Sequence, residues 1–211
     1  MQANDNLAAV NRERFRKAGV LAINLMSGPG AGKTSLLERT AEALANELKI
    51  GVVEGDIATS RDSERLEKFR IPIVQINTGS ECHLDANMVY GAIRDFPVED
   101  LDVLIIENVG NLVCPAEFIV GEHHKVMLLS AAEGDDKPLK YPLMFHESSL
   151  KLLNKIDLIP FTNFDIGAAH RNALKVSPKL KIINISCRTG EGLEDWYKWL
   201  REERETAKNS R

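Results

Sequence analysis

The sequence predicts an α/β fold in which a mainly parallel central sheet is flanked by helices on both faces. Three observations predict it. Seven runs rich in Val, Ile and Leu are continuously apolar, which is typical of strands buried on both faces. Helix-like stretches lie between most of these runs, and strands that alternate with helices form parallel, right-handed βα units. A glycine-rich loop joins the first run to the first helix, as in folds that bind ligands at the carboxyl ends of their strands.

The predicted elements follow in chain order. The strands are residues 20–26, 50–53, 71–76, 101–106, 125–130, 150–153 and 180–185. The helices that follow the first strand are residues 34–48, 60–69, 84–95, 164–176 and 192–205. A weaker apolar pattern predicts a short helix over 7–17, and the segment 134–138 is predicted to be a loop. We therefore expect an N-terminal helical arm (1–18), one domain (19–205) and a polar tail (206–211) that frays.

Length and composition exclude several classes of protein. The chain has 211 residues, which suit a single domain with a proper core. Its 27 Lys and Arg against 31 Asp and Glu give a net charge of −4, which argues against a nucleic-acid partner. No apolar run approaches the roughly 20 residues of a membrane span, so we expect no membrane partner and a cytoplasmic location. The three cysteines are an odd number, and reduced thiols are expected.

The segment Ser27–Ser35 reads Ser-Gly-Pro-Gly-Ala-Gly-Lys-Thr-Ser and predicts a phosphate-binding loop. Backbone N–H groups and the start of a helix bind anions, and glycines let the backbone approach them. Lys33 is expected to reach the β- and γ-phosphates, and the Thr34 hydroxyl to bind Mg²⁺. Ser27 stands where the pattern normally begins with glycine. The fold is therefore expected to be a P-loop NTPase, with phosphates bound by Gly28, Pro29, Gly30, Ala31, Gly32, Lys33, Thr34 and Ser35.

A second motif, Asn154-Lys155-Ile156-Asp157, follows the sixth predicted strand and selects the base. One carboxylate, that of Asp157, can accept hydrogen bonds from both N1–H and the 2-amino group of guanine, and adenine offers neither donor. Asn154 is expected to tie this loop to the phosphate loop, and the Lys155 stem to cover the base. The predicted ligands are GTP and GDP, with the base pocket completed by Ser186, Cys187 and Arg188.

Acidic residues at strand ends predict the magnesium site and the catalytic groups. Glu107-Asn108-Val109-Gly110 stands where GTPases usually carry Asp-x-x-Gly. We therefore expect Glu107 to help hold Mg²⁺ and the Gly110 N–H to donate a hydrogen bond to the γ-phosphate. Asp56, with Asp62 nearby, is expected beside the metal or the attacking water. Asn111 stands where a glutamine is usual, so hydrolysis by the protein alone should be slow, on the order of 10⁻³ s⁻¹. The predicted catalytic residues are Lys33, Asp56, Glu107 and Gly110, and the Mg²⁺ residues are Thr34, Asp56, Asp62 and Glu107.

Cysteine and histidine side chains raise a further possibility, a transition-metal site. Cys82-His83 follows the third predicted strand, and Cys114 comes shortly after Gly110. Thiolate and imidazole suit Zn²⁺ or Ni²⁺ better than Mg²⁺. Spacing alone leaves the choice open, because an isolated cysteine is usually a small buried apolar residue. Three donors also leave a tetrahedral shell incomplete, so water or a second subunit would complete it.

Other histidine and tryptophan side chains favour structural roles. The pair His123-His124 is interpreted as a solvated turn, and His146 and His170 as surface residues. Trp196 and Trp199 are spaced to pack from one face of the last predicted helix.

Taken together, these motifs resemble the hydrogenase nickel-incorporation GTPase family, HypB. The resemblance covers nearly the whole chain and includes 54–56, 78–84, 107–115, 133–142 and 154–157. It implies a GTP-hydrolysing metallochaperone that forms a homodimer with nucleotide and assists nickel insertion into the hydrogenase large subunit. It also implies that Cys82, His83 and Cys114 bind Ni²⁺ or Zn²⁺, and that the partners are a small zinc-containing hydrogenase maturation protein and the large-subunit precursor. Residues 1–19 contain neither Cys nor His, so we do not expect high-affinity nickel storage from them.

The spacing of Gly110 and Cys114 suggests that the γ-phosphate and the transition metal are coupled: GTP would draw Gly110 inward and move Cys114 with it. Three rival interpretations stay open. A small-molecule kinase of the same fold would need a lid with arginines near the phosphates, and no arginine-rich loop is evident. A GTP-binding module would bind nucleotide without meaningful turnover. The sister family of urease accessory GTPases is the nearest alternative.

Overall fold

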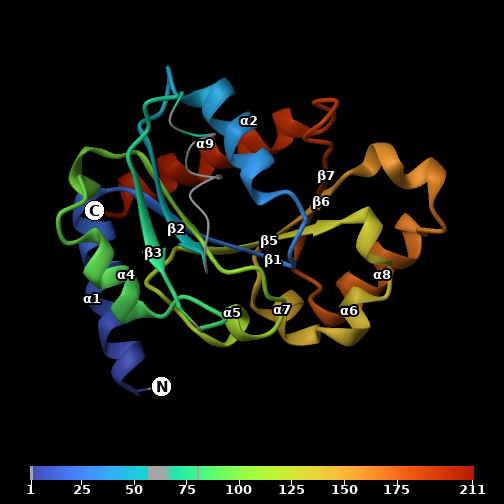
Figure 1. The fold of residues 1–211 in the computed structure, drawn as a ribbon, viewed down its shortest axis with the longest axis horizontal. Coiled ribbons are helices and arrows are strands. Elements are labelled where there is room, and N and C mark those ends of the chain that lie inside the picture. Colours follow the sequence, from blue (N-terminus) through green and yellow to red (C-terminus); the bar gives the residue numbers. More distant parts are fainter. Residues whose placement is uncertain (1, 57–65, 67, 80) are drawn as a thin grey trace.

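The computed structural model describes residues 2–56, 66, 68–79 and 81–211. Among these residues, seven parallel strands form one sheet in the order β3-β2-β4-β1-β5-β6-β7 (Figure 1). All seven predicted strands are confirmed. Their bounds are β1 Leu21–Ser27, β2 Ile50–Asp56, β3 Ile73–Asn77, β4 Val103–Glu107, β5 His124–Ser130, β6 Leu150–Asn154 and β7 Lys181–Asn184.

Helices cover both faces of the sheet (Figure 1). On one face lie α2 (Lys33–Leu44) and α9 (Leu193–Asn209), whose apolar side chains share a core cluster with β1. On the other face, α1 (Gln2–Ala18) and α4 (Ala86–Ile93) cover the half around β2 and β4. The remaining half of that face is covered by α5 (Cys114–Glu117), α7 (Pro142–Glu147) and α8 (Ile166–Val176).

The central strand β1 shows why its continuous apolar sequence forms this fold. All of its residues are buried. Side chains alternate between the two faces of a strand, so Leu21, Ile23 and Leu25 pack under α2 and α9, whereas Ala22 packs under α1 and α4. Burying each large aliphatic side chain contributes about 1.5–3 kcal/mol. On α9 the rings of Trp196 and Trp199 stack with centroids 5.4 Å apart inside the first of these clusters, which confirms their predicted packing role.

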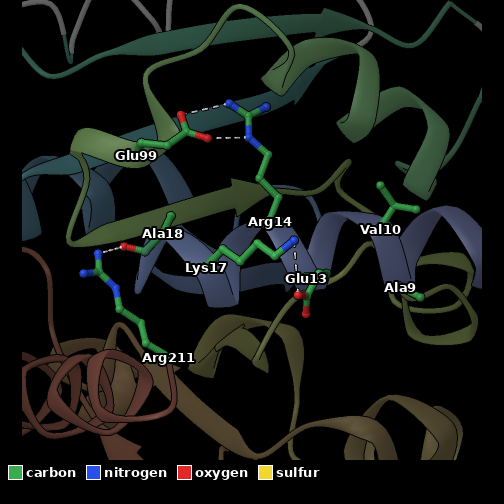
Figure 2. Close-up of a pocket in the computed structure, with 8 residues that line it drawn as sticks. All are labelled: Ala9, Val10, Glu13, Arg14, Lys17, Ala18, Glu99 and Arg211. Atoms are coloured by element: carbon green, nitrogen blue, oxygen red, sulfur yellow. Dashed lines mark hydrogen bonds and ion pairs between the residues drawn. The ribbon is translucent and has the colours of Figure 1, made fainter.

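Helix α1 is longer than the predicted 7–17 and packs on this domain. Its Phe15 is completely buried in the apolar cluster that α1 and α4 form with β2 and β4. Near its end, the Arg14 guanidinium pairs with the Glu99 carboxylate, on the 3₁₀ helix η1 (Val98–Asp100), at 2.8 and 3.0 Å (Figure 2). The arm therefore has a fixed place on the sheet.

The prediction that residues 206–211 fray is wrong. Helix α9 continues to Asn209, and Ala207 is buried in the core. Within the predicted tail, Arg211 donates to the Ala18 carbonyl (Figure 2), and just before it Arg204 pairs with Asp102. Polar composition alone could not distinguish a solvated tail from one held by ion pairs to distant residues.

The loop predicted over 134–138 is confirmed for residues 134–136, but residues 137 and 138 begin a short helix. The segment between β5 and β6 contains the 3₁₀ helix η2 (Ala131–Glu133) and the short helix α6 (Lys137–Lys140), followed by α7. A further 3₁₀ helix, η3 (Ile156–Phe161), follows β6. The helix predicted over 60–69 lies largely outside the described residues. In the part of the chain that the structure describes, no helix has the length and apolarity needed to cross a membrane.

Candidate functional site

The glycine-rich loop lies between the end of β1 and the first residue of α2, Lys33. Gly30 and Gly32 have φ angles of 74° and 108°, which only glycine adopts readily. A Cβ atom at Gly32 would lie 2.5 Å from Asn154 Nδ2, so the loop at this point also needs the space that glycine leaves. Thr34 and Ser35 follow in the first turn of α2, half-buried. The helix N-terminus and the loop backbone therefore form an anion-binding arrangement.

Ser27, the departure from the usual loop pattern, is buried at the end of β1. Its Oγ donates to the Gly28 carbonyl at 2.7 Å and accepts from Lys33 Nζ at 3.1 Å. Lys33 Nζ also lies 3.8 Å from Glu107 Oε1; the Glu107 side chain is buried and that of Lys33 is partly buried. The hydroxyl thus gives the lysine a local partner at the base of the loop.

Of the three predicted acidic groups, only Glu107 is fully described by the structure. Glu107 ends β4 and is 5% exposed. Asp56 ends β2, two strands from β1, but its side chain is not among the described ones. Asp62 lies outside the described residues. Gly110 lies against the phosphate loop, because a Cβ atom there would be 3.3 Å from Pro29 Cα.

The loop after β6 meets the phosphate loop. Asn154 Nδ2 donates to the Ala31 carbonyl at 2.9 Å, and its Oδ1 accepts from the Cys187 N–H at 3.1 Å. Lys155 has a left-handed backbone (φ 62°), and its Nζ donates to the Gly30 carbonyl at 2.7 Å. Asn154 therefore joins its loop to the phosphate loop, as the sequence predicts, and also to the loop of Cys187, which was not predicted.

A cavity of about 360 Å³ opens beside these loops. The Asp157 carboxylate faces it and accepts from Ser186 Oγ at 2.6 Å, while the exposed Arg188 guanidinium is 3.7 Å away. Burial raises the pKa of the Cys187 thiol to about 11, so this thiol stays protonated. The cavity is lined by Gly32, Ser35, Asn154, Lys155, Asp157, Leu158, Cys187 and Arg188.

The two thiols and the imidazole singled out in the sequence lie together. Cys82 Sγ is 3.0 Å from Cys114 Sγ and 3.8 Å from His83 Nδ1, and the donor atoms of all three lie within 4.8 Å of one another. Phe118 stacks on the His83 ring at 4.0 Å. The hydrogen bond with Cys82, and then burial, raise the pKa of the Cys114 thiol. The set fits a soft divalent cation that takes one more donor from outside.

Sequence reasoning missed how this cluster is joined to the end of β4. Asn108, completely buried, accepts from the Leu84 N–H at 2.9 Å and from the Val109 N–H at 3.0 Å. Its Nδ2 donates to Asn24 Oδ1 on β1 at 3.1 Å. One side chain thus connects the segment of Cys82 and His83 to the segment of Gly110. An asparagine after a strand carries no distinctive signal in one sequence.

Glu133 and Arg39 were also missed. Glu133 Oε1 accepts from the Ser130 N–H at 2.8 Å in a capping box, and burial raises its pKa. A Cβ atom at Gly28 would lie 2.9 Å from Glu133 Oε2, so this carboxyl group abuts the phosphate loop. The spacing Ser130-x-x-Glu133 could have indicated the cap. Arg39 on α2 donates to the Cys187 carbonyl at 2.8 Å and braces the base-side loop, with no sequence signal.

The interpretation of His123-His124 as a solvated turn is wrong. Both rings are partly buried: His123 Nδ1 accepts from the Ala22 N–H at 3.0 Å, and His124 contacts Ser149 and Glu203 at 3.1 Å. Burial lowers the pKa of His123. The pair fixes the start of β5 instead of facing solvent.

Comparison with known proteins agrees with this geometry. The family model of the CobW/HypB/UreG nucleotide-binding domain matches residues 21–184. The hydrogenase maturation factor HypB of Rhizobium leguminosarum bv. viciae is 52% identical over 200 residues, which cover 95% of this chain and 67% of that protein. The crystal structure of HypB from Archaeoglobus fulgidus superimposes with a TM-score of 0.92 at 42% identity, covering 97% of this chain and 100% of that one. HypB from Helicobacter pylori in complex with nickel gives 0.91 at 41% identity, covering 97% and 96%. The chain therefore belongs to the CobW/HypB/UreG family of nucleotide-binding proteins, as one of its HypB hydrogenase maturation factors.

Proposed function

We propose that the protein is a GTP-hydrolysing metallochaperone that binds nickel or zinc and assists nickel insertion into the large subunit of [NiFe] hydrogenase. One observation carries the proposal: a single short segment, 107–115, places Glu107 and Gly110 beside the phosphate loop and also supplies Cys114 to the thiol cluster. The HypB relatives support the hydrogenase context. The reduced thiols that such a cluster needs favour the cytoplasm as its place of action.

GTP is the nucleotide that this site would take. Asp157 faces the cavity next to the loop and would accept hydrogen bonds from the guanine N1–H and 2-amino group. The phosphate loop and Lys33 would hold the triphosphate. Mg²⁺ suits the oxygen donors at the loop, so the Thr34 hydroxyl, Glu107 and Asp56 would hold it, and it would neutralise charge on the β- and γ-phosphates.

Nickel is the cargo, held by Cys82, His83 and Cys114 with a further ligand from water or a second protomer. GTP would draw the Gly110 N–H toward the γ-phosphate, and Cys114 would move with it because the two lie in one short segment. Hydrolysis would remove the γ-phosphate that holds Gly110, and the nickel ion would then be bound more weakly. The partners we propose are a second copy of the chain, bound with nucleotide, a small zinc-containing maturation protein and the hydrogenase large-subunit precursor.

A titration with Ni²⁺ and Zn²⁺ tests the proposal. Wild type, Cys82→Ala and Cys114→Ala are each titrated with GDP and with a non-hydrolysable GTP analogue, and Cys187→Ala serves as the matched thiol control. We expect both cluster variants to lose metal binding, Cys187→Ala to keep it, and wild type to differ between the two nucleotides. Equal affinities in all four proteins would exclude the metal site. Phosphate release in a single turnover, expected on the order of 10⁻³ s⁻¹, separates a GTPase from a module that only binds GTP.

A further inference from the structure

Two asparagines of α1 each bridge the two segments that carry the metal donors. Asn11 Nδ2 donates to the carbonyls of Ala86 and Val120, both at 2.9 Å. Asn4 accepts from the Ala86 N–H at 2.9 Å and donates to the Ile119 carbonyl at 2.9 Å. Ala86 comes three residues after His83, and Ile119 comes five residues after Cys114. Helix α1 is thus joined to both arms of the cluster, although it supplies no donor itself.

The surroundings of Asn11 indicate a specific role for its amide. The residue is completely buried, and in the described part of the chain its Oδ1 is a buried polar atom with no hydrogen-bond partner. Turning the amide over does not help, because both groups that face it are carbonyls. The amide thus satisfies two backbone carbonyls, one from each arm, and does so although its own oxygen stays without a donor. Its Nδ2 group is therefore a fixed link between the two arms.

The contact between α1 and the second arm is close. Gly121 has a φ of 105°, and a Cβ atom there would lie 2.6 Å from Asn11 Cβ and 2.9 Å from the Ala8 carbonyl oxygen. Arg12 donates to the Glu122 carbonyl at 3.1 Å, next along the same arm. The backbone of this arm therefore touches the backbone of α1 directly, and a shift of the helix is transmitted to it.

We propose that Asn4 and Asn11 are positioning residues for the metal site: they fix the separation between the Cys82-His83 arm and the Cys114 arm. The inference rests on the proposed function, since it concerns the same donors. The opposite face of α1 lines an open cavity of about 720 Å³ with Val10, Glu13 and Lys17 (Figure 2). The helix thus contacts a solvent-facing cavity on one side and the backbone of both arms on another.

Cobalt binding tests the role of the two amides, because thiolate-to-Co²⁺ charge-transfer absorption reports the donor geometry directly. Asn11→Leu removes both of its hydrogen bonds and keeps similar volume. Asn4→Asp keeps the acceptor for the Ala86 N–H and loses the donor to Ile119. Asn6→Ala, an exposed asparagine on the same helix, is the matched control. Both test variants should bind Co²⁺ roughly tenfold more weakly with an altered absorption band, as supporting partners of metal ligands do, and Asn6→Ala should match wild type.

Two further readouts separate positioning from a general loss of structure. The melting temperature of Asn11→Leu is expected to fall, because the Ala86 and Val120 carbonyls lose their donor, whereas the melting temperature of Asn4→Asp should change less. The affinity of all variants for a fluorescent GDP should equal that of wild type, which a general loss of structure would lower. Wild-type cobalt affinity in both test variants would overturn the inference, provided that Cys82→Ala loses the absorption band. If Cys82→Ala keeps the band and the affinity, the proposed metal site itself is wrong. Should Asn11→Leu fail to fold, Asn4→Asp alone decides between the two results.

Discussion

Asp157 is the residue on which the choice of nucleotide depends in our proposal. Replacing it with Asn turns one acceptor oxygen into an NH₂ group, which faces the donors of guanine and leaves them unpaired. We expect Asp157→Asn to weaken GTP binding roughly 10- to 100-fold and to favour XTP, since xanthine carries an oxygen in place of the 2-amino group. Competition of the two nucleotides against fluorescent GDP measures this, with the exposed Asp195→Asn as control. An unchanged preference for GTP would place the base elsewhere.

Lys151 on β6 is 1% exposed, and burial lowers its pKa to about 8 from an ordinary 10.5. Between these two values the unfolded chain holds the proton and the folded chain does not, so stability rises with pH across that window. Below it, burying the charge costs up to about 3 kcal/mol. Lys151→Met should therefore raise the free energy of unfolding at pH 7 by about 1–3 kcal/mol and remove the rise.

Urea denaturation at pH 7 and pH 9.5 checks the Lys151 prediction. Lys181→Met, at an exposed position on the neighbouring strand β7, is the control and should change little. A variant at position 151 that is less stable than wild type at pH 7 would show that the ammonium group is compensated where it lies.

Residues that recognise a ligand were easier to predict from the sequence than residues that hold other residues in place. Asp157 and Lys33 belong to short patterns whose chemistry is fixed by the ligand. Cys82 and Cys114 lie far apart in the chain and were assigned through the family resemblance, and the structure brings their thiols together. Asn108 and Arg39 act through contacts that exist only after distant segments meet. Their roles therefore cannot be predicted from the neighbouring residues in the sequence.

Among the elements, central strands such as β1 and β4 were predictable because every position is buried and most are apolar. The edge strands β3 and β7 are partly exposed and were indicated by their Val- and Ile-rich runs. The end of α9 was not predictable, because its stability comes from partners far along the chain, such as Asp102 for Arg204. The short helices between β5 and β6 were missed since Gly134, Pro138 and the charged residues between them usually indicate loops. Local composition thus failed where long-range contacts decide the structure.

The segment that follows β4 is the element whose movement matters most in the proposed function. Asn108 ties it to the Cys82-His83 segment through Leu84. Asn108→Leu should therefore reduce the ratio of nickel affinities between the GTP-analogue and GDP states toward one, from the roughly 5- to 150-fold range of allosteric coupling. Isothermal titration in both nucleotide states measures that ratio.

Loss of stability needs a separate control in this experiment, because Asn108→Leu leaves buried groups unpaired. Leu200→Ala, a fully buried position on α9, should destabilise the fold by about 2–5 kcal/mol and keep the ratio of nickel affinities. A ratio that stays at the wild-type value in Asn108→Leu would show that the two segments move independently.

At the scale of the whole molecule, the proposed function requires that the nucleotide site and the metal site share one coupling free energy. Suppose that nickel binds more tightly in the presence of the GTP analogue than in the presence of GDP. Nickel must then raise the affinity for the analogue, relative to the affinity for GDP, by the same factor. We expect equal factors from metal titration at saturating nucleotide and from nucleotide competition at saturating metal. Nickel affinities that are identical with GDP and with the analogue would rule out the coupling while leaving both sites intact.

Only three residues separate Gly110, which lies against the phosphate loop, from Cys114, which lies 3.0 Å from Cys82 Sγ. A stretch this short spans at most about 14 Å between the two residues even when fully extended, which limits how far one can move without the other. One extra residue would let the glycine move while the thiol stayed still, and one fewer would pull the thiol out of place. Insertions and deletions should thus be rejected in this stretch during evolution, even where its individual side chains are free to vary.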